Sequence, residues 1–269
     1  MTPETTERYI EFREPRTIVE LEEMLKLRYS VRRSCHLAAL CPENEAQIDL
    51  DEHDRNAYHL GLFMIEGHRF VPVGYSRFVL DYSGPQERWV EVIAKKNGLG
   101  HKLADPRVPF PCLKYMPFKY GKLVSELHTT ATAQGKVMGE SCGTVLRKDI
   151  RSIRTANRWV ESIVAYLMIY KGISYGTTVV SEHHAPFYYR FGFKPLAGIP
   201  VPWGSPHGIS GAHICLEHLP ENTPTVNRVY DAAHEFARSG KIVVSGQRHI
   251  RTILTESMHN ERIGVCTHA

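Results

Sequence analysis

The chain has 269 residues, of which 42% are hydrophobic and 23% are charged, and its formal net charge is +4. These values are ordinary for a globular domain, exclude a mostly disordered chain, and carry too little charge to indicate nucleic-acid binding. There is no apolar run of the ~18 residues that a transmembrane helix needs, and the polar N-terminus lacks a signal-peptide pattern, so we expect a cytoplasmic protein without an integral membrane segment.

The apolar pattern predicts a mixed order of strands and helices. Thr17 is expected to cap the first helix, with Glu20 at the capping-box position. In chain order we expect a strand (residues 9–13), a helix (17–35), two strands (58–65 and 70–80), a helix (86–96), a proline-rich loop (105–117), a helix (119–130), a strand (136–146), a long helix (152–171), a strand (175–180), a short helix (186–191), two strands (193–199 and 212–218) and a helix (222–239). This order predicts an α/β (α+β) mixed central sheet flanked by helices.

The clearest motif is the segment APFYYRFGF at residues 185–193. Gly192 can adopt a backbone conformation closed to other residues and so end the short helix, after which Phe193 begins a strand. This segment resembles the signature of the GNAT superfamily, and the resemblance implies the GNAT-type acyl-CoA N-acyltransferase fold. It also implies that Tyr188 faces the thioester sulfur and protonates the leaving thiolate. The alternative is that these aromatic residues only pack in the core.

Basic residues gather where the long helix is expected to begin. In the GNAT family this turn binds the pyrophosphate of coenzyme A, or the phosphopantetheine of a carrier protein, at a helix N-terminus. The resemblance assigns this role to Arg147, Arg151, Arg154 and Ala156. The family motif has glycine where this chain has Arg154, which favours a looser site that meets an acidic acyl carrier protein. The alternative is a solvated helix end.

Four further segments carry a narrower resemblance, spread over residues 20–200. They are LRYSV (27–31), DEHD (51–54), GYSRF (74–78) and GESC (139–142). Their order and spacing resemble those of acyl-homoserine-lactone synthases and N-acyl amino acid synthases. The resemblance assigns a charged cluster that holds the N-terminal helices and the acceptor to Arg28, Asp51, Asp54 and Arg77. A structural ion-pair network is the alternative for these residues.

In the last of these segments, Glu140 is expected to take the proton from the attacking amine, and Ser141 is expected to contact the substrate. The family places an arginine after this motif, whereas this chain has Cys142 and Gly143. That departure makes an N-acyl amino acid product at least as plausible as a homoserine lactone.

The sequence therefore predicts an acyltransferase that moves a long acyl chain from acyl carrier protein, or from coenzyme A, to a small amino-acid-like amine. We expect one GNAT-like domain over residues 1–220 and a helical extension over residues 221–269. No tightly bound cofactor, metal or nucleic acid is expected, and His213, Cys215 and His218 lack both a shared strand face and a fourth ligand. The alternatives are a short-chain acetyltransferase that uses acetyl-CoA, and an inactive domain that senses acyl thioesters.

Overall fold

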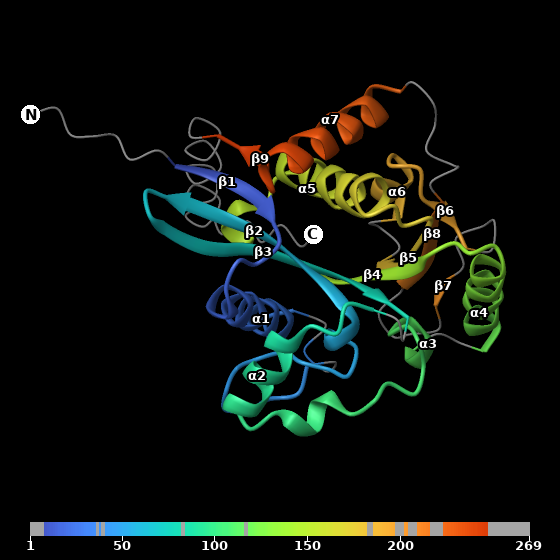
Figure 1. Cartoon of the computed structure of the whole chain (residues 1–269), viewed down its shortest axis with the longest axis horizontal. Helices are drawn as coiled ribbons and strands as arrows, with labels where there is room; N and C mark the ends of the chain where they lie inside the picture. Colours follow the sequence, from blue (N-terminus) through green and yellow to red (C-terminus); the bar gives the residue numbers. More distant parts are fainter. Residues whose placement is uncertain are drawn as a thin grey trace, which may run out of the picture.

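The computed structural model describes residues 8–35, 38, 41–81, 84–115, 118–181, 185–196, 202–203, 209–215 and 223–246. Its strands form one sheet in the order β6-β8-β5-β4-β3-β2-β1-β9, with β7 paired to β8 (Figure 1). Among these strands, β4 and β5 pair in parallel and the other pairs are antiparallel. The strands are β1 (Arg8–Arg13), β2 (Ala57–Glu66), β3 (Arg69–Leu80), β4 (Met138–Leu146), β5 (Tyr175–Ser181), β6 (Lys194–Pro195), β7 (Pro202–Trp203), β8 (Ile209–Cys215) and β9 (Ile242–Ser245).

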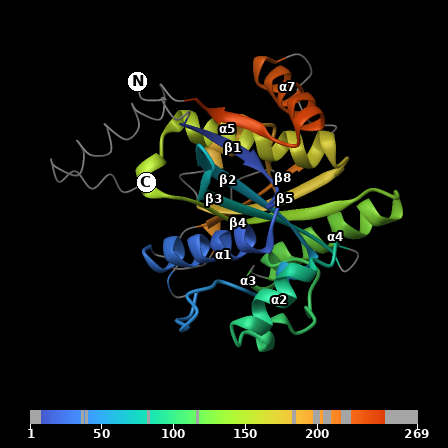
Figure 2. The same cartoon turned by 60° about the vertical axis from the view of Figure 1, so that its left-hand side comes forward.

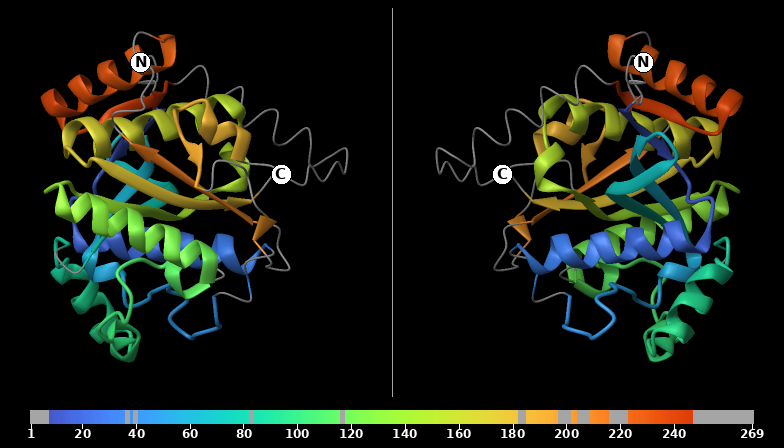
Figure 3. Two further views of the ribbon diagram at one scale, coloured as in Figure 1. Left: turned by 90° about the vertical axis from the view of Figure 1, so that its right-hand side faces the viewer. Right: turned by 90° about the vertical axis from the view of Figure 1, so that its left-hand side faces the viewer.

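Helices cover both faces of this sheet. α5 (Ile153–Val164), α6 (Ala185–Tyr189) and α7 (Pro224–Ser239) lie over one face, whereas α1 (Ile18–Arg33) and α2 (Arg88–Lys96) lie over the other (Figures 1 and 2). Figure 3 shows α4 (Phe118–Ala133) beside β4 and β5, away from α7, and α3 (Cys112–Tyr115) precedes it. The predicted architecture, a mixed central sheet flanked by helices, is confirmed. None of the helices in the described ranges has the length and apolar composition of a membrane span.

Each face of the sheet buries its own apolar cluster. On the α5 side, Phe12 of β1 packs among Tyr166 and Phe236, and all three are buried. On the α1 side, Leu25 of α1 and Ile93 of α2 belong to a second buried cluster. Because both faces are covered, polar side chains within the central strands are removed from water unless a gap reaches them.

Two local predictions are confirmed in atomic detail. The Glu20 N–H donates to Thr17 Oγ1 at 3.2 Å, so Thr17 caps α1 as expected. The Glu20 carboxylate does not complete the capping box; it accepts from the Arg16 N–H and from Arg13 instead. Gly192 has φ of 88°, a left-handed conformation that allows the chain to leave α6 abruptly.

Three features differ from the sequence predictions. The segment predicted as a proline-rich loop over residues 105–117 contains α3; Pro111 stands just before its first residue, where proline is compatible with the start of a helix. The long helix predicted to Lys171 becomes π-helical over Ala165–Tyr170. Near the C-terminus, where the sequence shows no strand motif, β9 pairs with the open edge of β1.

The domain division at residues 220 and 221 stays a prediction. α7 packs against α5, and β9 extends the central sheet, so the described part of the C-terminal segment contacts the rest of the fold. Residues 216–222 and 247–269, including His218, lie outside the described residues.

The central feature for function is the short pairing of β4 with β5. The parallel register runs from Met138 with Tyr175 to Ser141 with Thr178, and it stops there although both strands continue. Just beyond this point β4 bulges against β3: a single residue of β3, Ser76, lies opposite two residues of β4, Gly143 and Thr144, and Gly143 takes a left-handed φ of 67°. The two strands therefore part in the middle of the sheet.

We predict that Gly139→Ala destabilises the fold. A Cβ at Gly139 would lie 2.6 Å from the Val79 carbonyl oxygen and against the Phe78 ring. Since backbone cannot move as a side-chain end can, the cost should be about 2 kcal/mol or more in the free energy of unfolding. Gly100→Ala is the control, because a Cβ there meets no atom within 4 Å. Urea unfolding of both variants would contradict the prediction if their midpoints coincide.

Candidate active site

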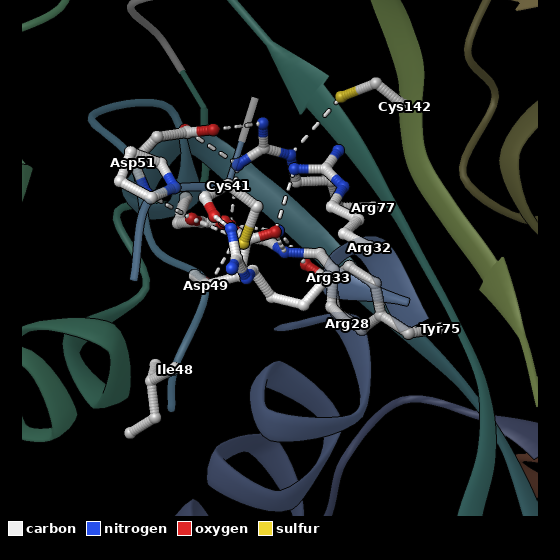
Figure 4. A network of polar contacts seen from close by, with 12 residues as sticks. Arg28, Arg32, Arg33, Cys41, Ile48, Asp49, Asp51, Tyr75, Arg77 and Cys142 are labelled. Atoms are coloured by element: carbon white, nitrogen blue, oxygen red, sulfur yellow. Dashed lines mark hydrogen bonds and ion pairs between the residues drawn. The ribbon is translucent and has the colours of Figure 1, made fainter. Parts of the chain in front are cut away.

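Two buried arginines, Arg28 and Arg77, contact the carboxylate of Asp54. Figure 4 shows both arginines in a network of polar contacts that includes Asp51 and Tyr75. Arg28 of α1 donates from both terminal nitrogens to the two Asp54 oxygens, each at 2.9 Å. Arg77 of β3 places Nη1 2.7 Å from Asp54 Oδ1. Arg77 also binds Asp51 with both terminal nitrogens, at 2.8 and 2.7 Å. The four charged residues that the sequence predicted as a cluster therefore lie in direct contact.

The network is balanced in charge. Arg28 and Arg32 both contact the Asp49 carboxylate, so three arginines face three aspartates. Burial alone would raise the pKa of Asp54, but Arg28 and Arg77 outweigh it and hold that pKa well below its usual range. The pKa of Asp51 is likewise lowered, with burial opposed by Arg77. Both carboxylates are ionised at neutral pH.

Two neutral groups complete the network. The Tyr75 hydroxyl accepts from Arg28 Nη1 at 2.9 Å and lies 2.9 Å from His59 Nδ1. His59 Nε2 lies 2.9 Å from the Asp54 carbonyl oxygen. Burial lowers the pKa of His59 to about 4, so its ring is neutral. Alternation along β3 places Tyr75 on the same face as Arg77, a signal that the sequence analysis missed.

Only part of this cluster is open to a substrate. The side chains of Arg28 and Asp54 are 0% exposed, whereas that of Asp51 is 32% exposed. Arg28 and Asp54 therefore hold α1, the segment after it and β3 together from within, and Asp51 is the member that a molecule in solution reaches.

Glu140 is a buried carboxyl group on the same face of the sheet as Arg77. The pairs of Arg77 with Cys142 and of Val79 with Glu140 give this shared face. The Cys112 N–H, at the start of α3, donates to Glu140 Oε2 at 2.8 Å. Burial raises the pKa of Glu140 to about 7, although Cys112 and Arg77 act to lower it. The sequence did not predict the contact with Cys112, because it joins residues 28 positions apart.

A small apolar cavity lies on the opposite face, between the parting strands and α5. Ser141 contributes to it because it points away from Glu140, and Tyr188 of α6 borders it. The Tyr188 ring packs edge-on against Phe193 with centroids 5.4 Å apart, and burial raises the pKa of Tyr188 to about 12. The lining residues are Phe78, Ser141, Thr144, Val160, Ile163, Val164, Leu167, Met168, Gly176, Thr177, Tyr188 and Phe193.

The predicted donor residues gather at the turn between β4 and α5. Arg147 is paired with Asp149 at 2.6 Å, and Arg151 donates to the Leu146 carbonyl oxygen at 2.9 Å. Arg151 and Arg154 are exposed. Ala156 lies one helical turn before Val160 of the cavity.

The N-terminus of α5 is already capped. The Thr155 N–H donates to Ser152 Oγ at 3.1 Å, and the Ala156 N–H donates to the Ser152 carbonyl oxygen at 2.9 Å. A pyrophosphate at this helix end would compete with Ser152 for the Thr155 N–H. The exposed charges of Arg151 and Arg154 meet no such competition.

The sequence matches no family model and no curated protein. Among solved structures, the chain resembles FeeM, an N-acyl amino acid synthase from uncultured soil microbes, with 14% identity, a TM-score of 0.48, and coverage of 83% of this chain and 99% of that one. It also resembles the acyl-homoserine-lactone synthase LasI, with 15% identity, a TM-score of 0.47, and coverage of 84% and 96%. BjaI, a CoA-dependent acyl-homoserine lactone synthase, has 16% identity, a TM-score of 0.45, and coverage of 80% and 82%. At these values each is a resemblance only, and the chemistry of the site is derived from its own residues.

We predict that Arg28→Met destabilises the protein by about 3–5 kcal/mol, because it removes one of the two arginines that contact each of the buried carboxylates of Asp54 and Asp49 and leaves the cluster with an excess negative charge. Lys26→Ala, in the same helix, is the control. It removes two ion pairs of a 41% exposed side chain and should cost less than about 1 kcal/mol. Equal urea midpoints for the two variants would contradict a structural role for the buried pair.

Proposed function

We propose that the protein is an N-acyltransferase that moves an acyl group from a thioester to the amine of a small acceptor. The main support for this proposal is the arrangement of side chains around β4 and β5. Where β4 and β5 part, a buried carboxyl group with a raised pKa, Glu140, lies on one face of the sheet, and an apolar cavity bordered by Tyr188 lies on the other. This arrangement suits a reaction in which a polar amine and an apolar acyl chain approach one carbonyl carbon from opposite sides.

The proposed chemistry is a direct transfer. Glu140 takes a proton from the acceptor's ammonium group, the free amine attacks the thioester carbon, a C–N bond forms and the C–S bond breaks. A base with a pKa of about 7 suits this step, because it is ionised for much of the time at neutral pH and still holds a proton well.

The role of Tyr188 in this proposal differs from full proton transfer. A thiol has a pKa near ~8.5, well below the value of about 12 for Tyr188, so the phenol would not give up its proton to the thiolate. Tyr188 would instead donate a hydrogen bond that stabilises the negative charge developing on sulfur. The thiolate then leaves and takes a proton from solvent, and the nitrogen releases its second proton to solvent as the amide forms.

For the acceptor, we propose a small amino-acid-like amine, with an N-acyl amino acid or an acyl-homoserine lactone as the product. Asp51 would attract the ammonium group at the exposed edge of the charged cluster, and Ser141 would lie at the gap where the two substrates meet. For the donor, we propose a long acyl chain on acyl carrier protein. The cavity is almost wholly apolar, and Arg151 and Arg154 offer exposed positive charge to an acidic carrier.

The proposal is tested with purified protein, acetyl, octanoyl and dodecanoyl thioesters of coenzyme A and of acyl carrier protein, and a panel of amino acids and their derivatives. Mass spectrometry of the products should find an N-acyl amine that requires the protein. A rate that saturates with acetyl-CoA, and none with the longer donors, would instead favour a short-chain acetyltransferase. Thioester binding without turnover for every amine would indicate a sensor and would contradict the proposal.

We predict that Glu140→Gln lowers kcat/KM by about 10²–10⁴-fold. For the same acceptor, the rate of the unmodified protein should rise through pH 7 by a step that the variant lacks. Folding raises the pKa of Glu140. Its contribution to the free energy of unfolding is therefore fully present below the pKa that Glu140 has in the unfolded chain, and it is lost as the pH rises through about 7. At pH 8 the variant should therefore be at least as stable as the unmodified protein. An unchanged rate in a folded variant would exclude Glu140 as the base.

We also predict that the double variant Arg151→Glu/Arg154→Glu raises KM for the acyl carrier protein donor by about tenfold or more, most strongly at low salt. Arg88→Glu/Lys95→Glu makes the same charge change at exposed positions of α2, on the opposite face of the sheet, and should leave that KM within about twofold. If both variants change KM equally, the basic turn is not the docking site. If only acyl-CoA turnover falls, coenzyme A is the donor.

A further inference from the structure

Two histidines are buried beside the charged cluster, and they differ in their hydrogen bonds. Both ring nitrogens of His59 have partners, Tyr75 and the Asp54 carbonyl oxygen. His53 is 1% exposed, and neither of its ring nitrogens has a hydrogen-bond partner in the part of the chain that the structure describes. Its Nε2 lies 3.9 Å from Glu52 Oε1, which is beyond hydrogen-bond distance. Buried polar atoms are nearly always paired, so this ring needs an explanation.

His53 lies next to the proposed acceptor site. The backbone N–H of His53 donates to Asp51 Oδ1 at 2.9 Å, and Asp51 in turn binds Arg77. Glu140 lies on the same face of the sheet as Arg77, so His53 and Glu140 both lie near the ion pair of Asp51 with Arg77. Because the side chain of Asp51 is 32% exposed, solvent reaches the edge of this region.

The unused hydrogen-bond donor and acceptor of the His53 ring define the kind of group that it can bind. Burial lowers the pKa of His53, so the ring is neutral and offers one N–H donor and one lone pair. The cations near His53 are already paired with carboxylates. Arg77 serves Asp51 and Asp54, and Lys114 contacts Glu52. A carboxylate placed here would find no unpaired cation among the described residues, whereas an uncharged carbonyl oxygen needs only the ring N–H.

We propose that His53 binds the acceptor through an uncharged carbonyl next to the amine, so that the preferred acceptor is an α-amino amide, ester or lactone rather than a free amino acid. The amine of such a molecule lies two bonds from its carbonyl carbon, a compact pair of groups for neighbouring side chains to recognise. Asp51 would attract the ammonium end, and His53 would hold the carbonyl end. This inference rests on the proposed acyl transfer and narrows its acceptor: a free amino acid, and with it an N-acyl amino acid as the direct product, is disfavoured.

His53→Phe tests the inference, with His59→Phe as the matched control. Phenylalanine keeps the volume of the ring and removes both nitrogens. The His53 ring makes no hydrogen bond to any residue that the structure describes, so its replacement should leave the urea midpoint unchanged or higher. His59→Phe should lower the midpoint, because it removes one hydrogen-bond partner from the buried Tyr75 hydroxyl and one from the Asp54 carbonyl oxygen. A purely structural His53 would make the two variants behave alike.

The kinetic readout uses L-alaninamide, L-alanine and propylamine as acceptors with one acyl donor. The unmodified protein should have its lowest KM for L-alaninamide. His53→Phe should raise that KM about tenfold, the loss of one hydrogen bond, toward the value for propylamine, with the donor KM unchanged. A lower KM for L-alanine than for L-alaninamide, or a KM for L-alaninamide that His53→Phe leaves unchanged, would overturn the inference.

A binding readout separates this inference from the proposed function. Histidine ring Cε1–H resonances are recorded while L-alaninamide is added without any donor, and the His53 signal is identified as the one missing from the His53→Phe spectrum. We expect that signal to shift saturably with L-alaninamide and not with propylamine. No shift would overturn the role of His53. If the signal shifts but no amine is ever acylated, the site at His53 stands and the proposed acyl transfer fails.

Discussion

The contact of Asp54 with Arg28 and Arg77 joins three separate parts of the chain at the centre of the molecule. Arg28 comes from α1, Arg77 from β3, and Asp54 from the segment between them. Since charges this deep in a protein are tolerated only when they are paired, each partner fixes the other two. The position of Asp51 at the exposed edge, and of His53 and Glu140 beside it, follows from that arrangement.

The second constraint is the short pairing of β4 with β5. Backbone hydrogen bonds close the sheet from Met138 to Ser141, and beyond that residue they are absent between these two strands. Adjacent residues of β4 then serve opposite faces, Glu140 toward α3 and Ser141 toward the cavity under α5. A reaction between a polar and an apolar substrate would use this region, because adjacent residues of β4 there face a buried carboxyl environment on one side and the apolar cavity on the other.

The sequence predicted those parts of the structure that local chemistry determines. Thr17 caps the helix that follows it, and Gly192 takes a left-handed conformation after the short helix α6. Both effects involve only nearby residues of the chain, so the local sequence was enough to predict them. The cluster of Arg28, Asp51, Asp54 and Arg77 was also foreseen, but its division into buried and exposed members was not. Both aspartates have the same chemistry, and the spacing of the motif does not say which of them the helix covers.

Contacts between segments that are distant in the chain could not be predicted from the local sequence. β9 contains only a four-residue strand, and its pairing depends on the free edge of β1 more than 200 residues earlier. The N–H of Cys112 that reaches Glu140 lies in a segment whose prolines indicated a loop. The missing partners of His53 became visible only when its neighbours were in place, because a buried unpaired group is a property of the packed structure and not of the sequence.

In the proposed reaction, the acyl chain and the amine occupy opposite faces of the sheet and meet where β4 and β5 part. The most direct test is a crystal structure with a stable analogue in which an acyl chain, a pantetheine thioether and an α-amino amide are joined at one carbon. We expect the analogue to thread the gap beside Ser141, with its chain among Val160, Ile163 and Leu167 and its nitrogen beside Glu140. Density for the chain and the amine on the same face of the sheet would contradict it.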